Sequence, residues 1–232
     1  MPVGKVSLVG VGPGDPELIT RKAERVLRAA DVVYHPGPSS ERGFAIRIVS
    51  GVVGPATEVR AAAVEMQEPG DRYETLAAEL AAEARGGRQV AFITEGDPLL
   101  YSTASRLLAI LRARWPELVV EVIPGVTSIT AAAAAAGRSL VQGSETLLIV
   151  PACHHADELE RLIDRHQCVV LVKIGSVFPQ IVALVQRRGW SGRVIYAEKV
   201  GTPDERVVHD LASVDPATVS YFSLVLVDTR LD

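Results

Sequence analysis

The chain has 232 residues, 48% of them hydrophobic, which is enough to bury one large core or two smaller ones, as in a compact enzyme. Its 24 Lys and Arg against 28 Asp and Glu give a net charge of -4, which argues against a nucleic-acid-binding protein. Two cysteines are too few for a disulfide framework, so we expect a cytoplasmic protein. We expect neither a signal peptide nor a membrane span, because the longest apolar stretch, residues 130–136, is far shorter than a bilayer requires.

The first half of the chain alternates between strand-like and helix-like segments. Apolar runs predict strands at residues 6–11, 32–34, 90–94 and 119–123. Helical spacing predicts helices after Thr20 and at residues 73–84, 103–114 and 128–136. Residues 36–70 are rich in Gly, Pro, Ser and charge, so we expect mostly loops there, with a weak helical stripe at residues 45–49. This alternation predicts a largely parallel sheet with helices on its faces.

The second half differs in having little helix between its last strands. We expect strands at residues 146–150, 168–173, 193–197, 205–210 and 222–227, and helices at residues 157–165 and 177–188. Such an order predicts a mixed sheet. We place the domain boundary between residues 138 and 139, so the predicted fold class is two-domain α/β, with a mostly parallel N-terminal sheet (residues 1–138) and a mixed C-terminal sheet (residues 139–232).

Three stiff loops rich in glycine and proline follow predicted strands of the first half. They are Gly10-Val11-Gly12-Pro13-Gly14-Asp15-Pro16, Glu95-Gly96-Asp97-Pro98 and Pro124-Gly125-Val126-Thr127-Ser128. The first is neither a dinucleotide fingerprint, because Asp15 stands where a third glycine is needed, nor a phosphate loop ending in Gly-Lys-Ser/Thr. Because ligands of open α/β sheets bind beyond the carboxyl ends of the strands, we expect the three loops to converge on one site.

The polar residues of these loops suit a ligand that carries an amino acid. Asp97 could face its positive end, while the hydroxyls of Thr127 and Ser128 and the helix start behind them could hold its carboxylate. The alternatives are an ordinary turn carboxylate at Asp97 and a plain helix cap at Ser128.

Taken together, GVGPGDPELIT, EGDPLLY and PGVTS, in this order and spacing, resemble the tetrapyrrole methylase family of S-adenosylmethionine-dependent enzymes. The segments ETLLIVPA, VVLVKIGSVFPQI, YAEKVGTPDERV and YFSLVLV look like the branch that acts at C20 of precorrin-2. The resemblance covers nearly the whole chain, although residues 54–70 match that branch less clearly. It implies a homodimer with a cofactor cleft between the two domains and a tetrapyrrole trough beside it.

The resemblance also implies which residues bind the cofactor. These are Pro13, Glu95, Gly96, Asp97, Leu100, Tyr101, Thr127 and Ser128, completed by the backbone near Ala152, Cys153 and Ile174. The implied reaction transfers the sulfonium methyl of S-adenosylmethionine to C20 of precorrin-2 or cobalt-precorrin-2 (cobalt-factor II) in cobalamin biosynthesis, leaving S-adenosylhomocysteine. The group that removes the C20 proton stays unassigned.

A tetrapyrrole of this type carries many carboxylates, so its trough should offer cationic side chains. The candidates are Arg21, Arg42, Arg47, Lys173, Lys199 and Arg206, and for each the alternative is a solvated surface charge. Lys173 and Lys199 stand out because each follows an apolar run.

Other interpretations remain open. The chain could methylate another tetrapyrrole position (C2/C7, C11 or C17), a protein side chain or ribosomal RNA, or bind a tetrapyrrole without catalysis. His154 and His155, next to Cys153, raise the alternative of a metal chelatase, but adjacent residues rarely converge on one ion, so we expect no metal site. His35, His166 and His209 are expected to be surface or capping groups.

Overall fold

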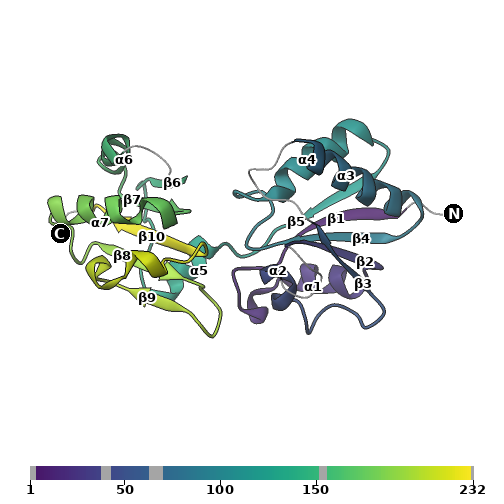
Figure 1. The fold of residues 1–232 in the computed structure, drawn as a ribbon, viewed down its shortest axis with the longest axis horizontal. Helices are drawn as coiled ribbons and strands as arrows, with labels where there is room; N and C mark the ends of the chain where they lie inside the picture. The colour runs from purple at the N-terminus through teal and green to yellow at the C-terminus, as the bar shows by residue number, and fades with distance from the viewer. Residues whose placement is uncertain (1–3, 38–42, 63–69, 152–155, 231–232) are drawn as a thin grey trace. The chain divides into compact units, whose positions relative to one another are not determined.

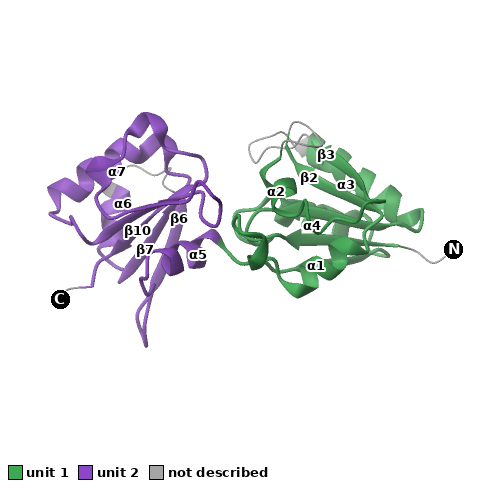
Figure 2. Cartoon of the chain, turned by 90° about the horizontal axis from the view of Figure 1, so that it is seen from below, with its two compact units in different colours: residues 1–127 green, residues 128–232 purple. Residues whose placement is uncertain are grey.

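The computed structural model describes residues 4–37, 43–62, 70–151 and 156–230. The chain divides into two compact units, residues 1–127 and 128–232, drawn in green and purple in Figure 2. The predicted boundary between residues 138 and 139 falls later than this division, because α5 (Ser128–Ala135) groups with the second unit.

Unit 1 contains a five-stranded parallel sheet with the order β3-β2-β4-β1-β5. Its strands are β1 (Lys5–Gly10), β2 (Val32–Pro36), β3 (Glu58–Ala62), β4 (Gln89–Thr94) and β5 (Val119–Ile123). The central strands are almost entirely buried, as continuous apolar runs require when both faces of a sheet are covered. Because all five strands run the same way, their carboxyl ends lie along one edge.

Helices cover both faces of this sheet (Figure 1). They are α1 (Arg21–Arg28), α2 (Phe44–Ile48), α3 (Gly70–Arg85) and α4 (Thr103–Arg114), with a short 3-10 segment, η1 (Pro16–Leu18), before α1. Strand alternation divides the core into two layers: Phe92 packs with residues of α3 and α4, and its neighbour Ile93 packs with residues of α1 and α2. The predicted parallel α/β layering is confirmed.

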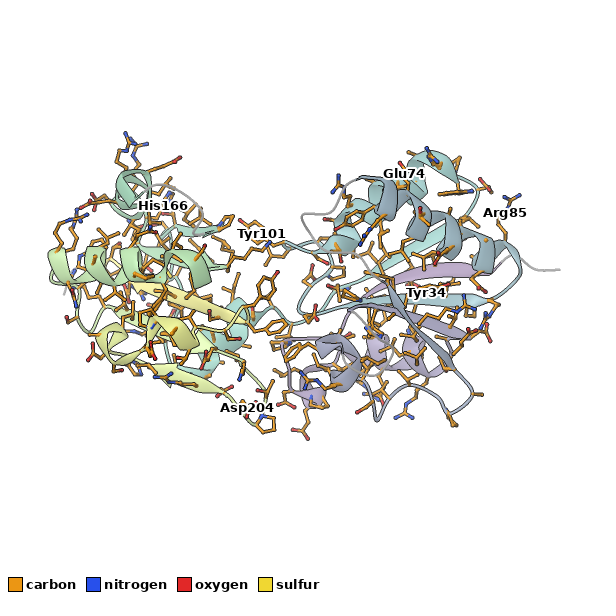
Figure 3. The ribbon with its side chains drawn as sticks, in the orientation of Figure 1. Tyr34, Glu74, Arg85, Tyr101, His166 and Asp204 are labelled. Carbon is orange, nitrogen blue, oxygen red and sulfur yellow. The ribbon has the colours of Figure 1, made fainter. Side chains whose placement is uncertain are left out.

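The edge strand β3 lies in the segment that we expected to form mostly loops, so that expectation was wrong for Glu58–Ala62. The strand lacks the apolar alternation that predicts a strand, because its polar residues form an ion-pair network along the sheet edge. The Arg60 guanidinium donates to Glu58, to Glu83 of α3 (2.6 Å) and to the Tyr34 hydroxyl of β2 (2.7 Å; Tyr34 is labelled in Figure 3). Such charges also protect an edge strand from pairing with another chain.

The opposite edge strand, β5, is secured by a second ion-pair group. Glu121 accepts hydrogen bonds from Lys5 of β1 (2.8 Å) and Lys22 of α1 (2.6 Å). These two ammonium groups lower the pKa of the Glu121 carboxyl to about 2.

Unit 2 contains a mixed five-stranded sheet with the order β6-β7-β10-β8-β9, as predicted. Its strands are β6 (Leu147–Pro151), β7 (Cys168–Val172), β8 (Val194–Glu198), β9 (Arg206–Val208) and β10 (Ser223–Asp228). Its helices are α5, α6 (Ala156–Ile163) and α7 (Phe178–Arg187), with 3-10 segments η2 (Gly175–Val177), η3 (Leu211–Ser213) and η4 (Pro216–Thr218). Among the helices within the described ranges, none is long and apolar enough to cross a lipid bilayer.

Candidate functional site

Three loops meet at the carboxyl edge of the unit 1 sheet. The first loop (residues 10–16) leaves β1, the second (residues 95–101) leaves β4 and the third (residues 124–128) leaves β5. Since β4 and β5 both flank β1, the topology makes the loops neighbours. The Gly96 N–H donates to the Gly12 carbonyl at 2.8 Å, and the reverse bond is 3.4 Å long. The predicted convergence of the three loops is therefore present.

Glycine is required where these backbones touch. A Cβ atom at Gly125 would lie 2.1 Å from the Gly96 carbonyl oxygen, and one at Gly10 would lie 2.5 Å from the same oxygen. Both distances are far below van der Waals contact, so a side chain at either position would force the loops apart. Gly96 also has a φ of +62°, which strains other residues. We call this arrangement the glycine cradle, defined by Gly10, Gly12, Gly96 and Gly125.

Asp97 links the second loop to the third. Its Oδ1 accepts from the Leu99 N–H (2.9 Å) and its Oδ2 accepts from the Gly125 N–H (3.1 Å). The carboxylate thus stabilises the turn and still contributes a negative charge beside the cradle. Its contact with the positive end of a ligand stays a prediction.

The other residues assigned to the cofactor in unit 1 lie on the same loops. Pro13 is buried in the first loop, and Leu100 and Thr127 are partly buried. Tyr101 has a φ of +53°, unusual for a residue with a side chain, and the residue is 40% exposed on the second loop (Figure 3). Backbone strain of this kind is concentrated at ligand sites, which supports a functional role for Tyr101.

His35 does not lie on the surface, so that expectation was wrong. It occupies β2, is fully buried, and its Nδ1 lies 3.0 Å from the Pro36 carbonyl oxygen. Among the described residues, its Nε2 has no hydrogen-bond partner. The strand register explains the burial: Tyr34 pairs with Phe92, so His35 lies beside Ile93 on the face that α1 and α2 cover. A position at the end of an apolar run in a parallel strand was the available sequence signal.

Glu95 directly follows β4, two residues beyond Ile93, and is partly buried. Burial raises the pKa of the Glu95 carboxyl, while backbone hydrogen bonds at Glu95 and Ala45 and the charge of His35 lower it. The net direction is upward, so this carboxyl holds its proton to a higher pH than an ordinary glutamate.

In unit 2, Lys173 and Lys199 follow β7 and β8. Both strands are antiparallel to β10, so they run parallel to each other and both lysines leave the sheet at one edge. Each lysine has a positive φ, +57° and +48°. Beside them, at the start of β10, the Tyr221 and Phe222 rings form an exposed edge-to-face pair with centroids 5.4 Å apart. Two lysines and an exposed aromatic pair therefore lie at the same edge of the unit 2 sheet.

Other assigned residues are less informative. Ala152, Cys153, His154, His155 and Arg42 lie outside the described residues. The Ile174 side chain is fully buried in the unit 2 core, which leaves only its backbone for a ligand, and Ser128 is exposed at the start of α5. Arg21 lines an open surface hollow on α1 with Glu24, Arg25 and Arg28, as a solvated charge would.

The remaining candidates lie on the surface or in partly buried positions. Arg47 is exposed on α2, over the Phe44 ring, and Arg206 is partly buried at the start of β9. His166 is partly buried beside the Thr146 hydroxyl, and His209 is exposed. No group of three or more His, Cys, Asp or Glu within the described ranges could hold a metal ion.

The sequence is similar to those of several known proteins. The chain is 34% identical over 237 residues to the precorrin-2 C(20)-methyltransferase of a Sinorhizobium species, covering 97% of this chain and 95% of that protein. It is 35% identical over 233 residues to the cobalt-precorrin-2 C(20)-methyltransferase of Salmonella typhimurium, covering 98% and 97%. The chain spans only 44% of the Mycobacterium tuberculosis relative named cobalamin biosynthesis protein CobIJ, with 36% identity over 235 residues.

Solved structures share the fold. The uroporphyrin-III C-methyl transferase of Thermus thermophilus in complex with S-adenosylhomocysteine superposes with a TM-score of 0.70 and 26% identity, covering 97% of this chain and 98% of that one. The sequence profile of the tetrapyrrole (corrin/porphyrin) methylases matches residues 5–214. This chain therefore belongs to the tetrapyrrole (corrin/porphyrin) methylase family.

Proposed function

We propose that the protein is an S-adenosylmethionine-dependent methyltransferase that methylates C20 of precorrin-2 or cobalt-precorrin-2 in cobalamin biosynthesis. The names of the Sinorhizobium and Salmonella relatives, which match over nearly the full length of the chain, support this assignment. The observation that carries it in the structure is the glycine cradle, where three strand ends bring bare backbone to one edge of the sheet.

The chemistry of the cradle and its loops supports S-adenosylmethionine as the ligand. Glycine backbone without side chains allows a ligand to approach closely, as Gly10 and Gly125 allow Gly96 to approach. Asp97 supplies the negative charge that suits an ammonium or sulfonium group, and Thr127 and Ser128 supply hydroxyls for a carboxylate. Bound there, the cofactor would supply an electrophilic methyl group on a positively charged sulfur.

The protein's contribution to this reaction is positioning. The attacking group is a carbon of the ring, so the chain needs no nucleophile of its own. The loops must hold the ring carbon, methyl and sulfur in line and keep water away from them. The rigidity of the cradle, with its close backbone contacts and the Asp97 bridge to Gly125, provides a fixed frame for this alignment.

Lys173 and Lys199 are proposed to hold carboxylates of the tetrapyrrole. Both leave one edge of the unit 2 sheet, and both have a positive φ, a backbone strain of the kind that is concentrated at ligand sites. The Lys199 ammonium lies 3.7 Å from the Asp204 carboxylate, an exposed and weak pair that a substrate carboxylate could replace.

The test is to incubate purified protein with methyl-labelled S-adenosylmethionine and precorrin-2, with and without cobalt, and to locate the label. We expect it at C20, and the better substrate will identify the metal-free or the cobalt-bound ring. Label at C2/C7, C11 or C17 would assign the protein to another branch of the family. Absence of transfer to either ring would contradict the proposal.

We also propose that the protein is a cytoplasmic homodimer that takes a free tetrapyrrole as substrate and binds neither membranes nor nucleic acid. Cys168 is a free, buried thiol. Burial raises its pKa to about 11, so the thiol is unreactive, as suits a reducing compartment.

The homodimer is tested by light scattering coupled to size-exclusion chromatography, which should give twice the mass of the chain. A monomer that is fully active would contradict the dimer.

A further inference from the structure

An exposed aromatic pair lies at the carboxyl end of β8, where β10 begins. Tyr221 is 64% exposed and Phe222 is 38% exposed, and within the described part of unit 2 no other large hydrophobic residue is exposed. Their rings meet edge to face, with centroids 5.4 Å apart and an angle of 85° between the ring planes. Two adjacent exposed rings form a contiguous apolar patch, and patches of this kind mark binding sites.

The backbone joins Lys199 directly to this pair. The Lys199 N–H donates to the Phe222 carbonyl oxygen at 2.8 Å, and the next residues along, Glu198 and Ser223, pair between β8 and β10. The turn that carries the rings is fixed as well. The Phe222 N–H donates to the Ser220 hydroxyl (3.1 Å), and the Ser223 hydroxyl donates to the Ser220 carbonyl oxygen (2.5 Å). The backbones of the lysine and of the aromatic pair are therefore held beside each other.

Lys199 has a strained backbone that its surroundings maintain. Its φ is +48°, and its carbonyl oxygen accepts hydrogen bonds from the Thr202 N–H (3.0 Å) and the Thr202 hydroxyl (2.8 Å). The same hydroxyl accepts from the Asp204 N–H at 3.2 Å, and the Gly201 N–H donates to the Glu205 carboxylate at 2.7 Å. Strain of this kind persists where the fold over-determines it and is concentrated at ligand sites. The loop after β8 therefore favours a binding role for Lys199 over a solvated charge.

We propose that Lys199, Tyr221 and Phe222 form an aromatic platform for the tetrapyrrole, in which the two rings contact the conjugated macrocycle and the ammonium pairs with one of its carboxylates. The proposal rests on the proposed methylation of a tetrapyrrole and assigns part of the substrate site. A tetrapyrrole of this type combines a large conjugated face with carboxylates at its rim. An aromatic surface beside a cation matches that combination. Lys173, which follows β7 at the same edge, offers a second cation to the rim.

The charges around Lys199 leave its ammonium available to a substrate carboxylate. The Asp204 carboxylate lies 3.7 Å away and is exposed, so solvent screens this pair. The two other carboxylates near in sequence have partners of their own: Glu205 accepts from the Gly201 N–H, and the buried Glu198 accepts from the Tyr196 hydroxyl. A substrate carboxylate held beside the aromatic rings would be less screened than Asp204 and would displace it.

The variants separate the rings from the charge. Tyr221→Leu and Phe222→Leu keep an apolar side chain but remove a ring, and Lys199→Met keeps the length of the side chain but removes its charge. Val119→Ala is the control for the rings, because Val119 is 62% exposed at the start of β5 in unit 1. Arg165→Met is the control for the charge, because Arg165 is exposed and precedes β7, at the other edge of the unit 2 sheet.

The affinity for the tetrapyrrole is measured by fluorescence titration with precorrin-2 or its cobalt complex, and the affinity for S-adenosylhomocysteine by calorimetry. We expect Tyr221→Leu and Phe222→Leu each to weaken tetrapyrrole binding by about 5- to 10-fold, and Lys199→Met by about 10-fold. S-adenosylhomocysteine affinity and both control variants should stay at the wild-type level. Added salt should weaken tetrapyrrole binding less in Lys199→Met than in the wild-type protein, because one ion pair is missing. Tyr221→Leu should keep the wild-type salt dependence.

A nuclear Overhauser measurement tests the contact itself. The chain has five tyrosines, so labelling them with carbon-13 gives few signals, and the signal that Tyr221→Phe removes belongs to Tyr221. The tetrapyrrole should give an Overhauser effect between its own protons and the Tyr221 ring protons, whereas S-adenosylhomocysteine should give none. Tyr221→Phe keeps the ring, so it should also keep the wild-type affinity for the tetrapyrrole.

If the wild-type protein binds neither precorrin-2 nor its cobalt complex, the proposed function fails and the platform with it. If it binds one of them, three results overturn the platform alone. One is that the ring and charge variants bind the tetrapyrrole as tightly as the two controls. Another is an equal loss of S-adenosylhomocysteine affinity, which would place the cofactor on the rings. The third is a fall from twice the chain mass to once in these variants, which would place a second chain there. If an aromatic variant does not fold, the Overhauser measurement on the wild-type protein decides the question.

Discussion

The glycine cradle predicts a large effect for a single added methyl group. In Gly125→Ala, the new Cβ would lie 2.1 Å from the Gly96 carbonyl oxygen and 2.9 Å from the Gly10 carbonyl carbon, both backbone atoms that cannot turn away. Overpacking of this kind costs about 1–3 kcal/mol. Separating the loops also weakens the paired Gly12 and Gly96 bonds, each worth about 1 kcal/mol. We therefore expect the free energy of unfolding of unit 1 to fall by about 3 kcal/mol.

Urea unfolding followed by tryptophan fluorescence measures this loss. Trp115 packs against the core of unit 1 and Trp190 lies in the core of unit 2, so a Trp190→Phe background makes the signal specific to unit 1. With a slope of about 2 kcal/mol per molar urea, the midpoint should fall by about 1.5 M. S-adenosylhomocysteine affinity should fall as well, because the loops that hold it move apart.

The matched control is Gly51→Ala, also in unit 1, where an added Cβ meets no atom within 4 Å. Its stability should change by less than about 0.5 kcal/mol. If Gly125→Ala behaves like Gly51→Ala in both stability and S-adenosylhomocysteine affinity, the three loops are not packed as described and the reasoning from the cradle is refuted.

Three further substitutions test other parts of the structure. Glu121→Gln should destabilise the protein by about 1 kcal/mol or less at pH 7, because its lysine partners are partly exposed. Since the folded pKa of Glu121 is depressed to about 2, the extra stability of the wild-type protein over Glu121→Gln should fall steadily as the pH drops from about 4.5 to 2, which thermal melts would follow. A stability difference at pH 2 as large as that at pH 7 would argue against the pairs. Tyr196→Phe removes the hydrogen bond that the Tyr196 hydroxyl donates to the Glu198 carboxylate at 2.5 Å, and should lower the free energy of unfolding of unit 2 by about 1–3 kcal/mol. Urea unfolding followed by Trp190 fluorescence measures this loss, and an unchanged urea midpoint would exclude the hydrogen bond. Lys173→Met should weaken tetrapyrrole binding in a fluorescence titration and leave S-adenosylhomocysteine affinity unchanged; unchanged tetrapyrrole affinity would remove Lys173 from the substrate site.

Periodicity was sufficient to predict most elements because the central strands are buried and apolar. The same rule explains the exception. Strand β3 lies at the sheet edge, where Glu58 and Arg60 can pair with charges on neighbouring elements instead of packing in the core. An alternation rule based on apolar residues cannot detect such a strand, since its stability comes from partners far away in the sequence.

The sequence was enough to predict that the three loops meet, because the topology of a parallel sheet brings the ends of neighbouring strands together. The burial of His35 was harder to predict: its place at the end of an apolar run was the one sequence signal, and the burial itself depends on the register between β2 and β4 and on glycine at position 43. The positive φ values of Lys173 and Lys199 were equally hidden, because a lysine carries no sequence signal for that conformation.

The most direct test of the whole account is calorimetric titration of the folded protein with S-adenosylhomocysteine, run in parallel on Gly125→Ala and Gly51→Ala. The account predicts saturable binding of one molecule per chain, weakened in Gly125→Ala and retained in Gly51→Ala. Absence of binding by the folded wild-type protein would contradict it.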